Sequence, residues 1–278
     1  MKTSVIYKLS KRVLFLVMVI VFSTWSAFPL YWMIKSAIAA GPIALSFNRL
    51  VPPQVSTSAF RDVLTQFPFF RWLGNSLIVS GGSTAVAILS GCLAGYSLSR
   101  YRSGSLTFFG TLLYFTQLLP HIVLLVPVFI LFDRLGLRNS IVGLVMVNSL
   151  FLTPIATWLL KGYFDSSPVE IEEAARIDGC SRLGTIFTIT VRMNLAGIFA
   201  TSLFVFLDSW YEWLFAATLI DRQERWTISA SIFVFIGEMG IDWKQMMAAG
   251  VLATVPTLLI FGVLQRAMMK EGSRVGTY

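Results

Sequence analysis

Residues 166–180, SSPVEIEEAARIDGC, carry five charged side chains, in a chain of whose 278 residues only 13% are charged. Carboxylates at this density can bind cations or face the basic groups of a partner protein. A metal site needs suitably spaced His, Cys or acidic ligands, but Cys180 has no CxxC partner and the only His, His121, lies far away. The segment therefore predicts a charged surface rather than a metal site or a catalytic centre.

The same segment has the start and stop signals of a short helix. Ser167 is a good N-cap, Pro168 suits the first helical position, and Glu170 completes a capping box three residues after the serine. Gly179 can adopt the left-handed conformation that ends a helix. These signals predict a helix over about 168–178, roughly 16 Å long.

Small and charged side chains alternate on this predicted helix. Glu172 stands four residues before Arg176, which favours an exposed ion pair. Ala174 and Ala175 leave the middle slim, so a partner surface can approach the backbone. The alternative is a solvated connecting helix, although the connector 161–191 exceeds the usual 2 to 8 residues between bundle helices.

The rest of the chain is too apolar for a soluble protein. Hydrophobic residues make up 56% of it and the mean hydropathy is +0.74, whereas soluble domains carry about 25% charged residues. Helices satisfy their own backbone polar groups in lipid, so long apolar runs predict an all-α polytopic membrane protein with six spans. The predicted spans are about 13–34, 74–99, 106–132, 139–161, 195–220 and 245–267.

The net charge of +8 reflects orientation in the bilayer rather than nucleic-acid binding, because Lys and Arg are scattered over termini and loops. With six spans, 13 of the 22 Lys and Arg fall on the side that holds both termini and the acidic segment. The positive-inside rule makes that side cytoplasmic. A cleaved signal peptide is the alternative for the N-terminus, but the run 13–34 is longer than a typical h-region.

Three residues within the acidic segment carry a specific resemblance. Glu173-Ala174-Ala175, followed at set distances by Gly179 and Ile189, resembles the EAA motif of permease subunits in binding-protein-dependent ABC importers. Similar residues occur along the whole chain. The chain resembles most the permeases of carbohydrate importers, in particular the smaller, six-span permease of the maltose type. Further matching residues include Asn75, Ser76, Ala94 to Arg100, Pro120, Pro127, Trp210, Glu212, Pro256, Gln265 and Arg266.

Two departures from this family pattern stand out. Arg192 and Ala196 occupy places where the family usually has prolines. Because proline breaks the helical hydrogen-bond ladder, their absence predicts a straighter start to the fifth span. The tail 272–278 also differs from the usual Gly-rich ending, so no role is assigned to it.

The resemblance implies an ATP-driven importer subunit in a bacterial-type cytoplasmic membrane, which forms half of the path for a sugar or oligosaccharide. It implies a second homologous permease, two ATPase subunits and an extracytoplasmic solute-binding protein docked near 35–71 and 220–244. The chain has no GxxxxGK[ST] loop, so ATP and Mg belong to the partner ATPase, and no cofactor or catalytic residue is expected here. The residues implied to couple to the ATPase are Glu170, Glu173, Ala174, Ala175, Ile177, Asp178, Gly179 and Arg182.

Two acids interrupt the fifth apolar run. Asp208 and Glu212 stand four residues apart, as on one helix face, and Asp208 lies roughly 18 Å into the span. Intramembrane carboxylates rarely face lipid, so both are expected to face a cavity or a partner subunit. In a sugar path they would accept hydroxyl hydrogen bonds beside aromatic faces, whereas the alternative is a structural hydrogen bond. The substrate-path candidates are Asp208, Trp210, Tyr211, Glu212, Asn148 and Gln117.

Other functions remain open from the sequence. The importer could carry a non-carbohydrate solute. A secondary transporter could use Asp208, Glu212 or His121 for protons, but it predicts an internal repeat that the sequence does not show. A polytopic membrane enzyme would need a nucleophile or metal set that the sequence lacks.

Overall fold

The computed structural model describes residues 2–40, 50–237 and 240–275, with side chains described from Lys11 to Lys270 within those ranges. Parts of two expectations, the docking loop at 41–49 and the tail at 276–278, lie outside the described residues. The chain divides into two compact units. Residues 1–67 and 234–254 form unit 1, and residues 68–233 and 255–278 form unit 2.

Unit 1 contains α1 (Lys2–Ile38) and α2 (Ser58–Gln66). The small residues Ala37 and Ala39 lie at the end of α1, and an isolated antiparallel bridge joins Ala39 to Val55. Two-residue antiparallel strands, β1 (Ile236–Gly237) and β2 (Gly240–Ile241), precede α13 (Trp243–Val275), which begins in unit 1 and continues in unit 2. The expected all-α fold therefore holds apart from this short ribbon.

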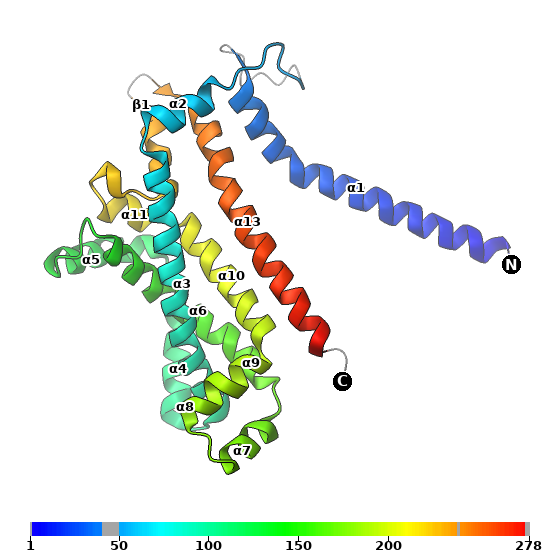
Figure 1. Ribbon diagram of the computed structural model, residues 1–278, viewed down its shortest axis with the longest axis vertical. Helices are drawn as coiled ribbons and strands as arrows, with labels where there is room; N and C mark the ends of the chain where they lie inside the picture. The colour runs from blue at the N-terminus through cyan, green and yellow to red at the C-terminus, as the bar shows by residue number, and fades with distance from the viewer. Residues whose placement is uncertain (1, 41–49, 238–239, 276–278) are drawn as a thin grey trace. The chain divides into compact units, whose positions relative to one another are not determined.

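Unit 2 is organised around three long helices, α3 (Phe69–Arg100), α6 (Ile141–Asp165) and α10 (Leu195–Tyr211) (Figure 1). Their packed faces form apolar clusters, one of which joins Cys92, Leu160 and Ile198. The other elements of unit 2 are α4 (Gly104–Thr116), α5 (His121–Arg134), α7 (Val169–Ile177), α8 (Arg182–Gly184), the π-helical segment η2 (Thr185–Thr190), α9 (Val191–Met193), α11 (Leu214–Leu219), the 3₁₀ turn η3 (Gln223–Arg225) and α12 (Ile228–Ser231). The 3₁₀ turn η4 (Ile232–Phe235) begins in unit 2 and ends in unit 1.

Two glycines bring α3 and α6 into close contact. A Cβ atom placed on Gly91 would lie 3.1 Å from the carbonyl carbon of Ala156. A Cβ on Gly95 would lie 2.9 Å from the Thr157 carbonyl oxygen and 3.0 Å from the Lys161 backbone nitrogen. Small residues four apart allow membrane helices to approach this closely. The Gly91-xxx-Gly95 pair thus sets the distance between the two central helices.

In the part of the chain that the structure describes, four helical segments have the length and apolarity to cross a membrane, namely Lys11–Ile38, Phe69–Arg100, Ile141–Asp165 and Trp243–Lys270. Two bent helix pairs also pass this test when each pair is taken together. Counting each pair as one span gives six within the described residues, in agreement with the six-span fold expected from the sequence.

The third expected span, 106–132, is not one straight helix. Helices α4 and α5 meet at 101°, and the break lies at residues 117–120. Pro120 has no N–H group to continue the backbone hydrogen bonds of α4, and it adopts an extended conformation before α5. Gln117 at the break donates to the Phe151 carbonyl oxygen of α6, at 2.9 Å.

The fifth span is also bent, so the expectation of a straighter start without prolines is wrong. The segment Arg182–Met193 and α10 meet at 86°, with Asn194 between them. The amide nitrogen of the Asn194 side chain donates to the Thr190 carbonyl oxygen at 2.8 Å and to Ser167 Oγ at 2.7 Å. These side-chain bonds hold the chain in a non-helical conformation that needs no proline.

Candidate functional site

Helix α7 lies with α8 and α9 at one end of unit 2 (Figure 1). The structure gives Val169–Ile177 for the segment expected at 168–178. Gly179 adopts φ +95°, and the N–H of Cys180 donates to the Ala175 carbonyl oxygen at 3.0 Å. This is the left-handed helix ending that glycine permits, as expected.

The expected capping box does not form at the start of α7. Pro168 precedes the helix without a side-chain cap, so the bond from Ser167 to the helix is absent. The Ser167 hydroxyl instead donates to Asn194 Oδ1 at 3.0 Å. Because the bend at Asn194 brings a polar side chain within reach, the serine ties α7 to the fifth span rather than capping its own helix.

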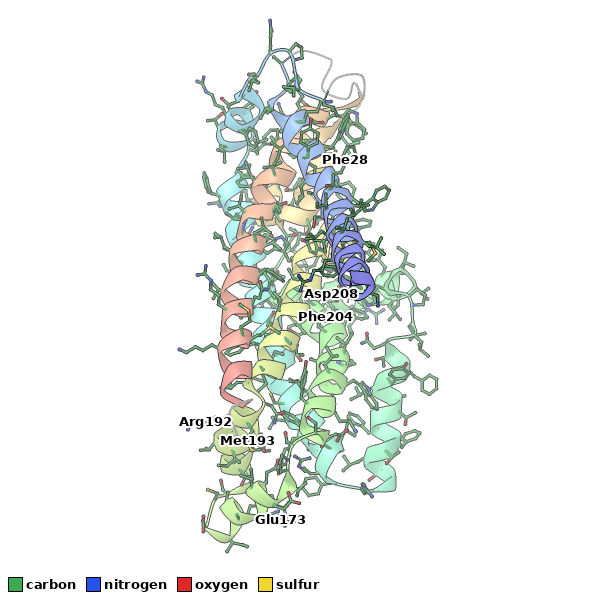
Figure 2. The ribbon with its side chains drawn as sticks, turned by 90° about the vertical axis from the view of Figure 1, so that its right-hand side faces the viewer. Phe28, Glu173, Arg192, Met193, Phe204 and Asp208 are labelled. Carbon is green, nitrogen blue, oxygen red and sulfur yellow. The ribbon has the colours of Figure 1, made fainter. Side chains whose placement is uncertain are left out.

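The outward face of α7 combines apolar and acidic side chains. We call Glu173, Ala174, Ile177, Asp178 and Leu183 the α7 surface; each is exposed, Ile177 to 86% and Leu183, on α8, to 60%. Glu170, Gly179 and Arg182 are also exposed, whereas Ala175 is half-buried. Figure 2 shows Glu173 at this end of unit 2. An exposed isoleucine beside small and acidic residues is suited to contact with another protein.

The inward face of α7 carries Glu172, whose side chain is 4% exposed. The expected exposed pair of Glu172 with Arg176 does not form, because stronger donors surround the carboxylate on the inside. Arg100 donates through Nη2 to Oε1 at 2.7 Å and through Nε to Oε2 at 3.0 Å. Tyr96 and Thr190 donate from 3.1 Å and 3.0 Å. We call these four residues, Tyr96, Arg100, Glu172 and Thr190, the Glu172 cluster.

The Glu172 cluster keeps its carboxylate ionised. Burial alone raises the pKa of Glu172, but hydrogen bonds from Arg100 and Thr190, together with the positive charge of Arg100, outweigh burial. The pKa of Glu172 is therefore held below its usual value. A buried ion pair with this many hydrogen bonds joins the two elements that carry it.

A pocket of about 270 Å³ lies at the other end of α10 from the bend. Its polar lining consists of His121, Asn148, Asp208, Tyr211 and Glu212. Its apolar lining consists of Phe151, Leu152, Trp213, Leu214 and Phe215. In Figure 2, Asp208 lies on α10 far from Glu173, so this pocket and the α7 surface are separate sites.

Asp208 and Glu212 reach the pocket from different elements rather than from one helix face. Helix α10 ends at Tyr211, and Glu212 has extended backbone angles. Its carboxylate accepts the N–H groups of Phe215 at 2.7 Å and Ala216 at 3.2 Å. Glu212 thus satisfies the free N–H groups of α11, and this capping breaks the expected continuous span 195–220.

Two substrate-path candidates lie outside the pocket lining. Trp210 is only 2% exposed and stacks on Phe206 with ring centroids 5.7 Å apart. Gln117 is engaged with the α6 backbone at the break before α5. Phe151 and Phe215, which line the pocket, stack with ring centroids 5.0 Å apart.

The loop after α11 is firmly held at the end of unit 2 opposite α7. Asn139, at φ +53°, accepts the N–H groups of Asp221 and Arg222 through Oδ1. Its side-chain amide and the Arg138 guanidinium both donate to Asp221, at 2.9 Å and 2.7 Å, which lowers the pKa of Asp221. Trp72 fixes the next turn by donating to the Gln223 carbonyl oxygen at 2.7 Å. This loop is therefore a pre-formed surface rather than a loose connection.

Sequence reasoning missed the Glu172 cluster and four apolar residues of the pocket lining, namely Phe151, Leu152, Leu214 and Phe215. Arg100 stands in the matched run that ends the second span, but its partner is 72 residues away. Among the residues that the structure describes, no three His, Cys, Asp or Glu side chains gather as a metal site requires. The chemistry available is hydrogen bonding and stacking in the pocket and protein contact at α7.

Known proteins resemble this chain in both fold and sequence. The chain is 30% identical to the inner membrane ABC transporter permease protein YcjP of Escherichia coli over 252 residues, which cover 90% of each chain. It is 29% identical to the trehalose/maltose transport system permease protein MalG of Thermococcus litoralis over 96% of each. A chain in the crystal structure of a bacterial ABC transporter involved in the import of the acidic polysaccharide alginate matches with a TM-score of 0.78 at 18% identity, over 91% of this chain and 95% of that one.

These similarities and the bent, multi-span helical fold define an ABC transporter permease. The sequence profile of one family matches residues 87–270. The chain belongs to this family, the binding-protein-dependent transport system inner membrane components. It is a multi-pass protein of the inner membrane.

Proposed function

We propose that this chain is one of two permease subunits in an ATP-driven importer of a sugar or oligosaccharide, and that α7 couples it to a separate ATPase. The observation that carries the proposal is the two-sided construction of α7. Its outer face offers Ile177 at 86% exposure with acids beside it, while its inner face is tied to the permease through Glu172. A short rigid helix of this kind can seat on a partner and transmit its displacement.

The α7 end of the chain faces the cytoplasm in this proposal, together with both termini. The positive-inside bias of Lys and Arg supports that orientation. The opposite end then meets the solute-binding protein, in keeping with the family name, and the loop held by Asn139 and Asp221 offers a pre-formed docking surface. ATP and Mg bind to the ATPase partner, of which two copies serve two permeases.

The pocket supports a carbohydrate as the solute. Asp208, Asn148 and His121 offer acceptors and donors for hydroxyl groups, and the Phe151–Phe215 stack and Trp213 offer flat apolar faces. The name of the Thermococcus litoralis relative, a trehalose/maltose permease, agrees with this solute class. Of the substrate-path candidates predicted from the sequence, Asp208, Asn148, Tyr211 and Glu212 are retained, and Trp210 and Gln117 are not.

The test is import by the purified complex in proteoliposomes that hold ATP inside and binding protein outside. Uptake should require the ATPase subunit, and a panel of mono-, di- and oligosaccharides should stimulate ATP hydrolysis selectively. Uptake that persists without the ATPase would favour a secondary transporter and overturn the proposal. An equal response to every sugar and to amino-acid controls would remove the carbohydrate assignment alone.

A further inference from the structure

The Glu172 cluster joins three segments that are distant in sequence. Glu172 belongs to α7, Tyr96 and Arg100 to the last turns of α3, and Thr190 to the π-helical segment η2. The two Arg100–Glu172 hydrogen bonds are parallel N–H···O⁻ bonds, which fix orientation as well as distance. Both side chains are almost withdrawn from solvent, at 10% and 4% exposure.

From this geometry we propose that Arg100 is a positioning residue for coupling, through which displacement of α7 reaches α3. This inference rests on the proposed function, in which an ATPase moves α7. The covalent link of α7 to α6, through residues 166–168, is short but includes no side-chain cap. The Arg100–Glu172 pair supplies a second, non-covalent link to a different central helix.

The displacement has a route from α3 to the pocket. Gly91 and Gly95 hold α3 so close to α6 that an added Cβ would meet the α6 backbone at 2.9 to 3.2 Å. Helices packed at this distance move together, because neither can shift toward the other. Helix α6 carries Asn148, Phe151 and Leu152 into the pocket lining. Movement at Arg100 therefore shifts one wall of the pocket.

A second tether limits how α7 can move. The Asn194 amide donates to Ser167 Oγ at 2.7 Å, which ties the start of α7 to the bend before α10. The Glu172 cluster ties its middle to α3. Because α7 is held at both places, it has to carry α3 with it rather than pivot away.

The experiment compares Arg100→Gln, Glu172→Gln and the reversed pair Arg100→Glu with Glu172→Arg in the complete transporter complex. Lys161→Gln is the matched control, since Lys161 pairs with Asp165 within α6 and takes no part in the Glu172 cluster. Three quantities are measured: ATPase subunit retained on purification, ATP hydrolysis with and without binding protein, and solute imported per ATP hydrolysed.

The single variants should retain the ATPase subunit and its basal hydrolysis, while solute imported per ATP falls about tenfold or more. The reversed pair should recover most of this ratio, and Lys161→Gln should leave it unchanged. Recovery by reversal would show that the ion pair itself is required, and unchanged ATPase retention and basal hydrolysis in the single variants would separate lost coupling from lost folding. An unchanged ratio in both single variants overturns the inference.

If the single variants do not fold, Arg100→Lys decides between the outcomes, because it keeps the positive charge but cannot form the two parallel hydrogen bonds to Glu172. A lower ratio supports the inference and an unchanged ratio overturns it. Wild-type complex that imports without binding an ATPase would instead overturn the proposed function itself. If the wild-type complex is coupled and the Arg100 variants import the same amount of solute per ATP, only the role of Arg100 is overturned.

Discussion

Replacing Gly95 with alanine tests whether the α3–α6 contact sets the packing of the central helices. The added Cβ would lie 2.9 Å from the Thr157 carbonyl oxygen and 3.0 Å from the Lys161 nitrogen, both backbone atoms that cannot rotate away. The helices must separate, and overpacking of this kind costs about 1 to 3 kcal/mol. Alanine regains only about 0.5 to 1 kcal/mol in helix propensity, so the variant should be less stable.

The control is Gly81→Ala in the same helix, where an added Cβ would meet no heavy atom within 4 Å. That variant should gain stability from helix propensity without a clash. The midpoint of thermal unfolding is measured for each purified chain in one detergent. Since each kcal/mol moves this midpoint by about 2 to 4 °C for a domain of comparable size, the two variants should shift it in opposite directions.

A higher midpoint for Gly95→Ala, matching that of Gly81→Ala, would refute the close packing. A lower midpoint for both variants would also count against it, because Gly81 has no neighbour to meet. Only the contrast between two glycines of one helix supports the contact.

Further outcomes follow from the other sites. The pKa of Glu172 is lower in the folded protein than in the unfolded chain. The ionised side chain therefore stabilises the fold above its unfolded pKa, and this stabilisation is lost as the pH falls through its folded pKa. In the Glu172→Gln variant, the free energy of unfolding should fall less steeply as the pH is lowered. Gly179→Pro cannot adopt φ +95° and should leave the spans inserted while import is uncoupled from ATP hydrolysis, as measured by solute imported per ATP. Glu173→Lys reverses a charge on the α7 surface and should weaken retention of the ATPase subunit in pull-down experiments; normal retention would contradict that contact. Asp208→Asn should raise the solute concentration for half-maximal import by about tenfold and leave basal ATP hydrolysis unchanged, since a hydrogen bond to a charged group contributes about 1.5 to 3 kcal/mol.

The sequence predicted the end of α7 and the membrane spans, because both depend on residues close together in the chain. Gly179 ends α7 where the sequence placed the end, because no other residue adopts φ +95° so readily. The long apolar runs predicted the straight spans for a similar reason, since chain length and hydropathy alone determine what can cross lipid. The spacing of Gly91 and Gly95 permits the close α3–α6 contact, because small residues four apart allow close approach, but the spacing alone does not specify which helix approaches.

Bends and partners depended on distant residues. Asn194 bends the fifth span through its hydrogen bond with Ser167, and Glu212 ends α10 by capping α11. The absence of proline therefore did not predict a straight span. Glu172 had a suitable partner four residues away in Arg176, yet it pairs with Arg100. A local pair exposed to water contributes only about 0.3 to 0.5 kcal/mol, whereas a buried carboxylate must find charged donors wherever the fold brings them.

The amino-acid sequence by itself determined that the chain is a helical membrane protein with a polar helix at α7, and that it resembles the binding-protein-dependent permeases. Those features follow from hydropathy, helix-ending residues and short motifs, which act over a few turns of chain. Only the tertiary structure decided that Glu172 faces Arg100, that Trp210 is buried, and that Asp208 shares a pocket with Phe151 and Phe215. Such contacts depend on how helices cross, and the side chains of a single helix do not specify which neighbour they will meet.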